Sequence, residues 1–137
     1  MADHAPVILN KVTEKTSLSS DNYATVAKFM ISEKFMKMPE WEHLTTSKLR
    51  GIYALIMNVY TKINAPEDYD RYRPDIEYLK VRMAYEAGRE KAVRKFLDVT
   101  TLMNAVDSIK SYDQFMLFCR YAESLVAYFK FYGGEDK

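Results

Sequence analysis

The chain has 137 residues, of which 48% are hydrophobic and 28% are charged. This length fits one domain with a sizeable core, and the composition excludes an intrinsically disordered chain. The formal net charge of +1 argues against a free-standing nucleic-acid-binding protein, which usually carries a large basic excess. The single cysteine, Cys119, excludes an intrachain disulfide and a cysteine-based metal site.

Residues 1–20 show little hydrophobic periodicity and include a Ser/Thr cluster. We expect a poorly ordered tail there, followed by a single helical-bundle domain over residues 21–137. No segment has the apolar run of a signal peptide or a membrane span, so we expect a cytoplasmic protein without membrane contact. Only four glycines and four prolines are present, which favours helices over turn-rich sheets.

Hydrophobic periodicity predicts an all-α fold, a compact bundle of about five to six helices. The helices are expected at about residues 21–37, 45–63, 74–88, 89–98 and 111–132, with residues 99–109 helical but the joint before them unplaced. Asp21 is a candidate cap for the first, Thr45 or Thr46 for the second, and Ser111 with Gln114 forms a capping box for the last. Gly88 is expected to mark a break or bend.

Two of these helices have unusual apolar patterns. The last one is apolar nearly all round, which is typical of the central helix of a bundle. The third has one apolar face of Ile76, Leu79, Met83 and Ala87, and a second of Tyr78, Val81 and Tyr85. A helix with two apolar faces is expected to lie between neighbours.

No sequence pattern indicates a catalytic, metal or cofactor site. The segment 40–43 contains a Glu-x-x-His spacing, but di-iron bundles need it twice, and the only other histidine is His4. Trp41 in this segment is expected to plug the bundle end. Cys119 has no nearby base in the sequence, so a buried structural thiol is expected.

Basic residues are unevenly distributed along the chain. The segment 71–95 holds eight Lys or Arg and four Asp or Glu, so its net charge is +4. A solvated helical face explains such a segment in most proteins. The alternative is an edge that contacts phosphates, for which the guanidinium fork of arginine is well suited.

Three sequence blocks carry a family resemblance: residues 45–53, residues 78–89, and residues 119–134 with the run Leu125-Val-Ala-Tyr-Phe-Lys-Phe-Tyr-Gly-Gly134. Together they resemble the small helical subunit of the type III-A CRISPR effector, the Csm complex, over about residues 41–135. The resemblance implies a non-catalytic helical bundle, with no cofactor, that acts in RNA-guided antiviral defence.

The resemblance also implies partners. These are the duplex of guide RNA (crRNA) and target RNA, the backbone and large subunits of the effector, and further copies of the chain itself. By position in the matched blocks, the expected RNA or neighbour contacts are Lys48, Arg50, Lys80, Arg82, Arg89, Arg120 and Lys130. Arg82 and Arg120 have a structural alternative, which is pairing with Glu86 or Glu123 on their own helices.

Two other functions stay open at this point. In one, the chain is a protein-binding helical adaptor whose basic edge meets an acidic partner and never touches RNA. In the other, Glu77, Glu86 and Glu123 converge in a cleft and perform acid–base chemistry.

Overall fold

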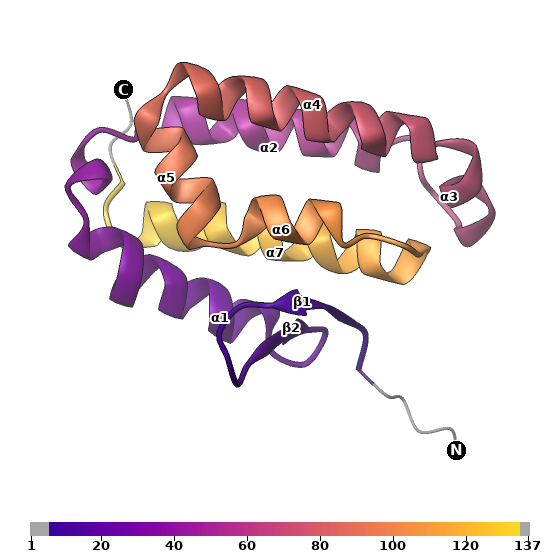
Figure 1. Ribbon diagram of the computed structural model, residues 1–137, viewed down its shortest axis with the longest axis horizontal. Helices are drawn as coiled ribbons and strands as arrows, with labels where there is room; N and C mark the ends of the chain where they lie inside the picture. Colours follow the sequence, from indigo (N-terminus) through magenta and orange to yellow (C-terminus); the bar gives the residue numbers. More distant parts are fainter. Residues whose placement is uncertain (1–5, 135–137) are drawn as a thin grey trace.

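The computed structural model describes residues 6–134 and confirms an all-α bundle. In Figure 1, α2 and α4 form one layer, α6 and α7 the next, and α1 with a small hairpin the third, while α5 crosses between the first two. The helices are α1 (Tyr23–Phe29), α2 (Thr46–Tyr60), α3 (Pro66–Arg71), α4 (Arg73–Arg89), α5 (Lys91–Val99), α6 (Leu102–Asp107) and α7 (Tyr112–Phe131).

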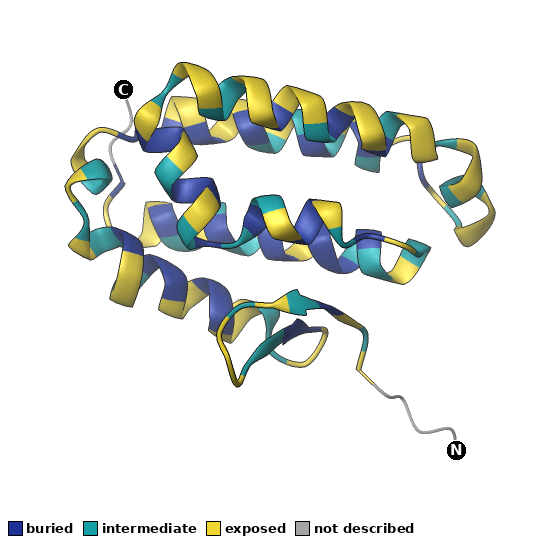
Figure 2. Cartoon of the chain, viewed as in Figure 1, coloured by how far each residue is buried: buried dark blue, intermediate teal, exposed yellow. Residues whose placement is uncertain are grey.

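Helix α7 is the central element of the bundle, as its sequence predicted. It packs against α1, α2 and α6, and Figure 2 shows buried residues along its length. Its buried side chains are Phe115, Leu117, Phe118, Cys119, Tyr121, Ala122, Leu125 and Phe129. Burying each large apolar side chain stabilises the fold by roughly 1.5–3 kcal/mol. Over the described residues, no helix has the length and apolarity that crossing a membrane requires.

One buried hydrogen bond fixes α7 to the joint between α5 and α6. The hydroxyl of Tyr121, a fully buried residue, donates to the Thr100 carbonyl at 2.6 Å. Burial raises the pKa of Tyr121 above its ordinary value. The next residue, Thr101, has a φ of 61°, a left-handed conformation that is unusual for a β-branched side chain. The joint that the sequence left unplaced therefore lies at Thr100 and Thr101.

The first 20 residues differ from the predicted tail wherever they are described. Strands β1 (Ile8–Lys11) and β2 (Ser17–Ser19) form an antiparallel hairpin, with a bulge between Ile8 and Asn10. Leu9 and Leu18 are buried in the core, and the Gln114 side chain on α7 donates to the Ile8 carbonyl at 2.8 Å. Two isolated leucines gave too little periodicity to predict this hairpin, but they suffice to anchor it.

The N-terminal caps of α2 and α7 lie at residues that the sequence predicted. Thr45 caps α2, where its Oγ1 accepts a hydrogen bond from the Lys48 amide at 3.2 Å. Ser111 caps α7 in the same way through the Gln114 amide at 3.1 Å. The Gln114 side chain accepts instead from the Lys110 amide, so the reciprocal half of the predicted capping box is replaced.

The chain breaks differ more from the prediction. Gly88 does not interrupt its helix, because α4 continues to Arg89 and the extended residue is Glu90. Residues 64–73 lie between two predicted helices and were expected to be a connector, but they contain α3. Asn22, rather than Asp21, precedes α1, which continues as a π-helical turn and a 3₁₀ turn to residue 37.

The Tyr121 hydrogen bond gives a test of the core. We expect Tyr121→Phe to lower the free energy of unfolding by roughly 1–3 kcal/mol, because the Thr100 carbonyl is left buried without its donor. Urea denaturation measures this change. The matched control is Tyr85→Phe, because Tyr85 is 61% exposed, and its effect should stay within about 0.5 kcal/mol. Equal effects of the two substitutions would show that the hydroxyl of Tyr121 contributes nothing.

Candidate nucleic-acid interface

A groove of about 330 Å³ lies between α2 and α4 and brings together three of the predicted contact residues. Its lining comprises Lys48, Gly51, Ile52, Leu55, Arg82, Glu86, Arg89, Glu90 and Val93. Gly51 has no side chain to fill the space, and a Cβ placed there would meet nothing within 4 Å. The groove is therefore open at Gly51, with Ile52, Leu55 and Val93 as its apolar floor and with cations and carboxylates along its rim.

Two of the three cations pair with carboxylates on the same rim. Lys48 Nζ lies 2.8 Å from Glu90 Oε1, and Arg89 Nη1 lies 3.3 Å from Glu86 Oε1. The hydrogen bond from Lys48, followed by the charge of its ammonium, holds the pKa of Glu90 below its ordinary value. All four side chains are partly exposed, so another anion can reach the cations and replace the carboxylates.

The third cation, Arg82, is exposed and pairs differently. Its guanidinium carbon lies 5.9 Å from the centre of the Tyr78 ring, and Arg89 lies in the same way 5.6 Å from the Tyr85 ring. The pairing of Arg82 with Glu86 that the sequence left open is not found among the described ion pairs, where Glu86 pairs with Arg89. Both arginines follow their tyrosines by four residues, a spacing that sequence inspection could have detected.

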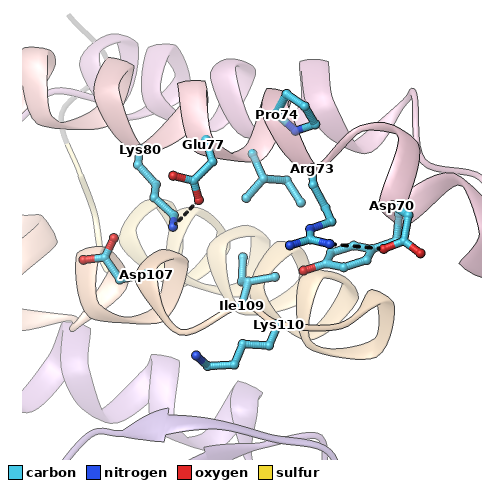
Figure 3. A pocket seen from close by; sticks show the side chains of 10 residues that line it. Asp70, Arg73, Pro74, Glu77, Lys80, Asp107, Ile109 and Lys110 are labelled. Carbon is cyan, nitrogen blue, oxygen red and sulfur yellow. Dashed lines mark hydrogen bonds and ion pairs between the residues drawn. The ribbon is translucent and has the colours of Figure 1, made fainter.

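Lys80 lies apart from the groove, in a larger hollow of about 940 Å³ formed by α3, α4 and the segment between α6 and α7. Its ammonium lies 2.7 Å from Glu77, and Arg73 lies 3.5 Å from Asp70 (Figure 3). Asp107 and Lys110 line the opposite wall. Three cations thus face three carboxylates, and this balanced hollow has no net attraction for a polyanion.

The remaining predicted residues lie on other surfaces. Arg120 is exposed on α7 and lines a hollow with Tyr53, Tyr60 and Cys119. Among the described ion pairs, none joins Arg120 to Glu123 within 4.0 Å. Arg50 is exposed on α2, and Lys130 is exposed near the end of α7. The structure therefore gathers Lys48, Arg82 and Arg89 and places the other four predicted residues elsewhere.

The carboxylates of the possible enzyme do not converge. Glu77 lines the hollow beside α3, Glu86 lines the α2–α4 groove, and Glu123 lines the hollow beside Tyr53. Within residues 6–134, no cluster of three or more His, Cys, Asp or Glu side chains could hold a metal ion. Cys119 is buried, which raises the pKa of its thiol and disfavours the reactive thiolate.

The segment around Trp41 is a 3₁₀ turn, Pro39–Glu42, at one end of the bundle. The Trp41 ring lies 5.0 Å from the Phe129 ring and 6.1 Å from the Phe35 ring, measured between centroids. These contacts with two buried phenylalanines give Trp41 the packing role that the sequence predicted.

Comparison with known proteins assigns the chain to a family. The model of the Csm2 type III-A family matches residues 22–135. The chain belongs to this family. The match confirms the resemblance based on the three sequence blocks. It begins at residue 22, whereas the resemblance was expected from about residue 41.

Relatives of the Csm2 family cover much of the chain. The "CRISPR system Cms protein Csm2" of Streptococcus thermophilus is 37% identical over 119 residues, which are 87% of this chain and 98% of that protein. The protein of the same name from Enterococcus italicus is 46% identical over 95 residues, 65% of this chain and 68% of its own. A relative from Mycobacterium tuberculosis is 35% identical over 98 residues.

The Lys48–Glu90 pair gives a test of the groove. We expect Lys48→Met to raise the pKa of Glu90 towards its ordinary value, because the hydrogen bond and the positive charge are both lost. A lowered carboxyl pKa stabilises the fold above the ordinary pKa, and that contribution disappears as the pH falls through the lowered one. Carbon-13 NMR titration of the glutamate carboxyls measures the shift. Lys80→Met is the control and should leave the titration of Glu90 unchanged.

Proposed function

We propose that this Csm2-family chain is a non-catalytic small subunit of a type III-A CRISPR effector complex, and that it contacts the crRNA–target RNA backbone in antiviral defence. The observation that carries the RNA contact is the convergence of Lys48, Arg82 and Arg89 on one open groove. Such cations recognise phosphates without reading sequence, which suits a duplex held by its shape and backbone.

The proposed RNA-contacting residues are those predicted from the sequence, with the groove as their centre: Lys48, Arg50, Lys80, Arg82, Arg89, Arg120 and Lys130. Lys80 is the weakest of them, because it is held in a charge-balanced hollow by Glu77. The proposed partners are the crRNA–target RNA duplex, the backbone and large subunits and further copies of this chain. We propose no cofactor and no metal, and a cytoplasmic location.

Two properties, one of the whole chain and one of the groove, weaken RNA binding by the isolated chain. The net charge is only +1, and the rim carboxylates Glu86 and Glu90 occupy two of the three cations. A few phosphate contacts give a dissociation constant of about 10⁻⁴ to 10⁻⁶ M at physiological salt. The chain therefore depends on basic neighbours that share the same RNA.

Co-purification tests the assembly. We expect the tagged chain, expressed with the other subunits of a type III-A effector and its guide locus, to recover those subunits and a repeat-derived guide RNA. Sequencing of the bound RNA and mass spectrometry of the bound proteins measure the result. Recovery of protein partners without RNA would support the second candidate function, a protein-binding adaptor. Recovery of the chain alone would contradict both functions.

The rim carboxylates give a direct test of RNA contact. We expect Glu86→Gln with Glu90→Gln to strengthen RNA binding by the isolated chain several-fold, because both substitutions remove anions that compete with phosphate. Fluorescence anisotropy with a labelled duplex of about 20 base pairs measures the affinity over a series of salt concentrations. Asp98→Asn with Glu33→Gln is the charge-matched control and should have a smaller effect, since both residues lie outside the groove. Equal effects of the two pairs would indicate that net charge acts without the groove.

A further inference from the structure

The outer face of α4 carries three large apolar side chains that the described part of the bundle leaves mostly exposed. We call them the α4 stripe: Tyr78, Val81 and Tyr85, which are 61%, 60% and 61% exposed. The opposite face of the same helix, with Ile76, Leu79 and Met83, is buried. Figure 2 shows that exposed residues run along the outer side of α4. The sequence predicted that both apolar faces of this helix would be covered by neighbours, but the described part of the bundle covers only one of them.

The stripe has the composition of a protein-binding surface. Tyrosine and arginine are enriched at the centres of protein interfaces, where they supply most of the binding energy. Here Arg82 lies against Tyr78 and Arg89 against Tyr85, which pre-positions both guanidiniums beside the apolar side chains. Arg89 is already paired with Glu86. Arg82 is therefore the cation of the stripe most available to a partner's carboxylate.

A nucleic-acid backbone fits this surface poorly. Val81 lies between the two tyrosines along the helix, and covering it with phosphates would strip water from charged oxygens without giving them a hydrogen bond. A protein surface with an apolar centre and an acidic border satisfies both parts of the stripe. Apolar side chains would cover Val81 and the tyrosines, and a carboxylate would accept the two parallel hydrogen bonds of the Arg82 guanidinium.

A symmetric contact with a second copy is disfavoured by charge. If two α4 helices packed antiparallel about the centre of the stripe, Tyr78 of one copy would face Tyr85 of the other. The two Arg82 residues would then be offset by only about one position along the paired helices. Like charges at such close range destabilise an interface. The stripe therefore suits a different surface of opposite charge.

We propose that the α4 stripe binds a second protein through a surface whose apolar centre is bordered by at least one carboxylate, which pairs with Arg82. This inference rests on the proposed function and changes one residue of it: Arg82, which also lines the α2–α4 groove, is assigned to a protein contact, and Lys48 and Arg89 remain for the RNA. The two partners would then meet along the line of Arg82 and Arg89, with RNA in the α2–α4 groove and protein on the stripe.

The test compares three variants of the full chain, each expressed with the other subunits of a type III-A effector and its guide locus. The stripe variant combines Tyr78→Ser, Val81→Ser and Tyr85→Ser. The surface control combines Ile8→Ser and Phe131→Ser, which are 53% and 75% exposed and lie outside the stripe. The groove variant combines Lys48→Ala and Arg89→Ala. Circular dichroism first establishes that each variant folds. The readouts are the amount of the chain in the purified complex and its ultraviolet crosslinking to RNA.

We expect the stripe variant to be lost from the complex at least tenfold, and the surface control to be retained. The groove variant should be retained but crosslink to RNA several-fold less. Arg82→Glu should reduce incorporation more than Arg82→Gln, because only the reversal repels a carboxylate. Normal incorporation of the stripe variant, with loss of RNA crosslinking by the groove variant, would overturn this inference and leave the proposed function standing. If the wild-type chain recovered no effector subunit, both would fail.

Two other occupants of the stripe, RNA and a second copy of the chain, would each give a different experimental result. Reduced RNA crosslinking by the stripe variant, with normal incorporation, would identify RNA as the occupant and overturn the inference. Sedimentation of the isolated wild-type chain as a dimer, with the stripe variant monomeric, would identify a second copy and overturn it equally. A monomer in both cases, together with loss of the stripe variant from the complex, supports the proposal.

Discussion

The burial of one broad apolar face of α7 is the constraint that orders the bundle. Because its buried side chains span more than a narrow stripe, more than one element must cover them, and α1, α2 and α6 do so. The remaining face, with Arg120, Glu123 and Lys130, is exposed. The one tyrosine fully enclosed there, Tyr121, needs an acceptor for its hydroxyl, and it finds one in the Thr100 carbonyl. That bond holds the α5–α6 joint against the core, where Thr101 keeps its left-handed backbone. The core around α7 thus determines both how its neighbouring helices pack and where the α5–α6 joint lies.

Covering α7 leaves α4 in the outermost position, and the functional surfaces follow from that. Helix α4 buries one face against α2, α5 and α6 and has no further layer above it. The charged side chains that the core excludes therefore collect along its edges. The α2–α4 groove is the junction of this outer helix with its neighbour, and Gly51 keeps it open. The groove is a consequence of layer order, since within residues 6–134 its lining comes from α2, α4, α5 and the residue that joins α4 to α5.

Signals that act within a few residues could be predicted from the sequence. The caps at Thr45 and Ser111, the apolar face of α4 and the buried face of α7 depend on spacing along one helix. The sequence predicted α7 to be apolar nearly all round, but Arg120, Glu123 and Lys130 lie on an exposed face. The Lys48–Glu90 pair joins residues 42 positions apart and needs the packing of α2 on α4, which no local pattern specifies. For the same reason, the sequence did not indicate that the predicted cations lie on several different surfaces. Periodicity indicates which way a side chain points from its own helix, but not which helix it meets.

The charge pairs on the groove bear on how a nearly neutral chain would carry out the proposed contact with a polyanion. In the isolated chain, Glu86 and Glu90 satisfy Arg89 and Lys48. Exchanging an exposed carboxylate for a phosphate gains little at each site, because exposed ion pairs contribute only about 0–1 kcal/mol. In the proposed assembly this balance changes, since neighbouring subunits would fix the RNA beside the groove and the entropy of association would already be lost. The proposed role of the α4 stripe is the protein attachment that such a mechanism requires. A subunit held by apolar contacts can then use weak, exchangeable cations to follow a duplex of any sequence.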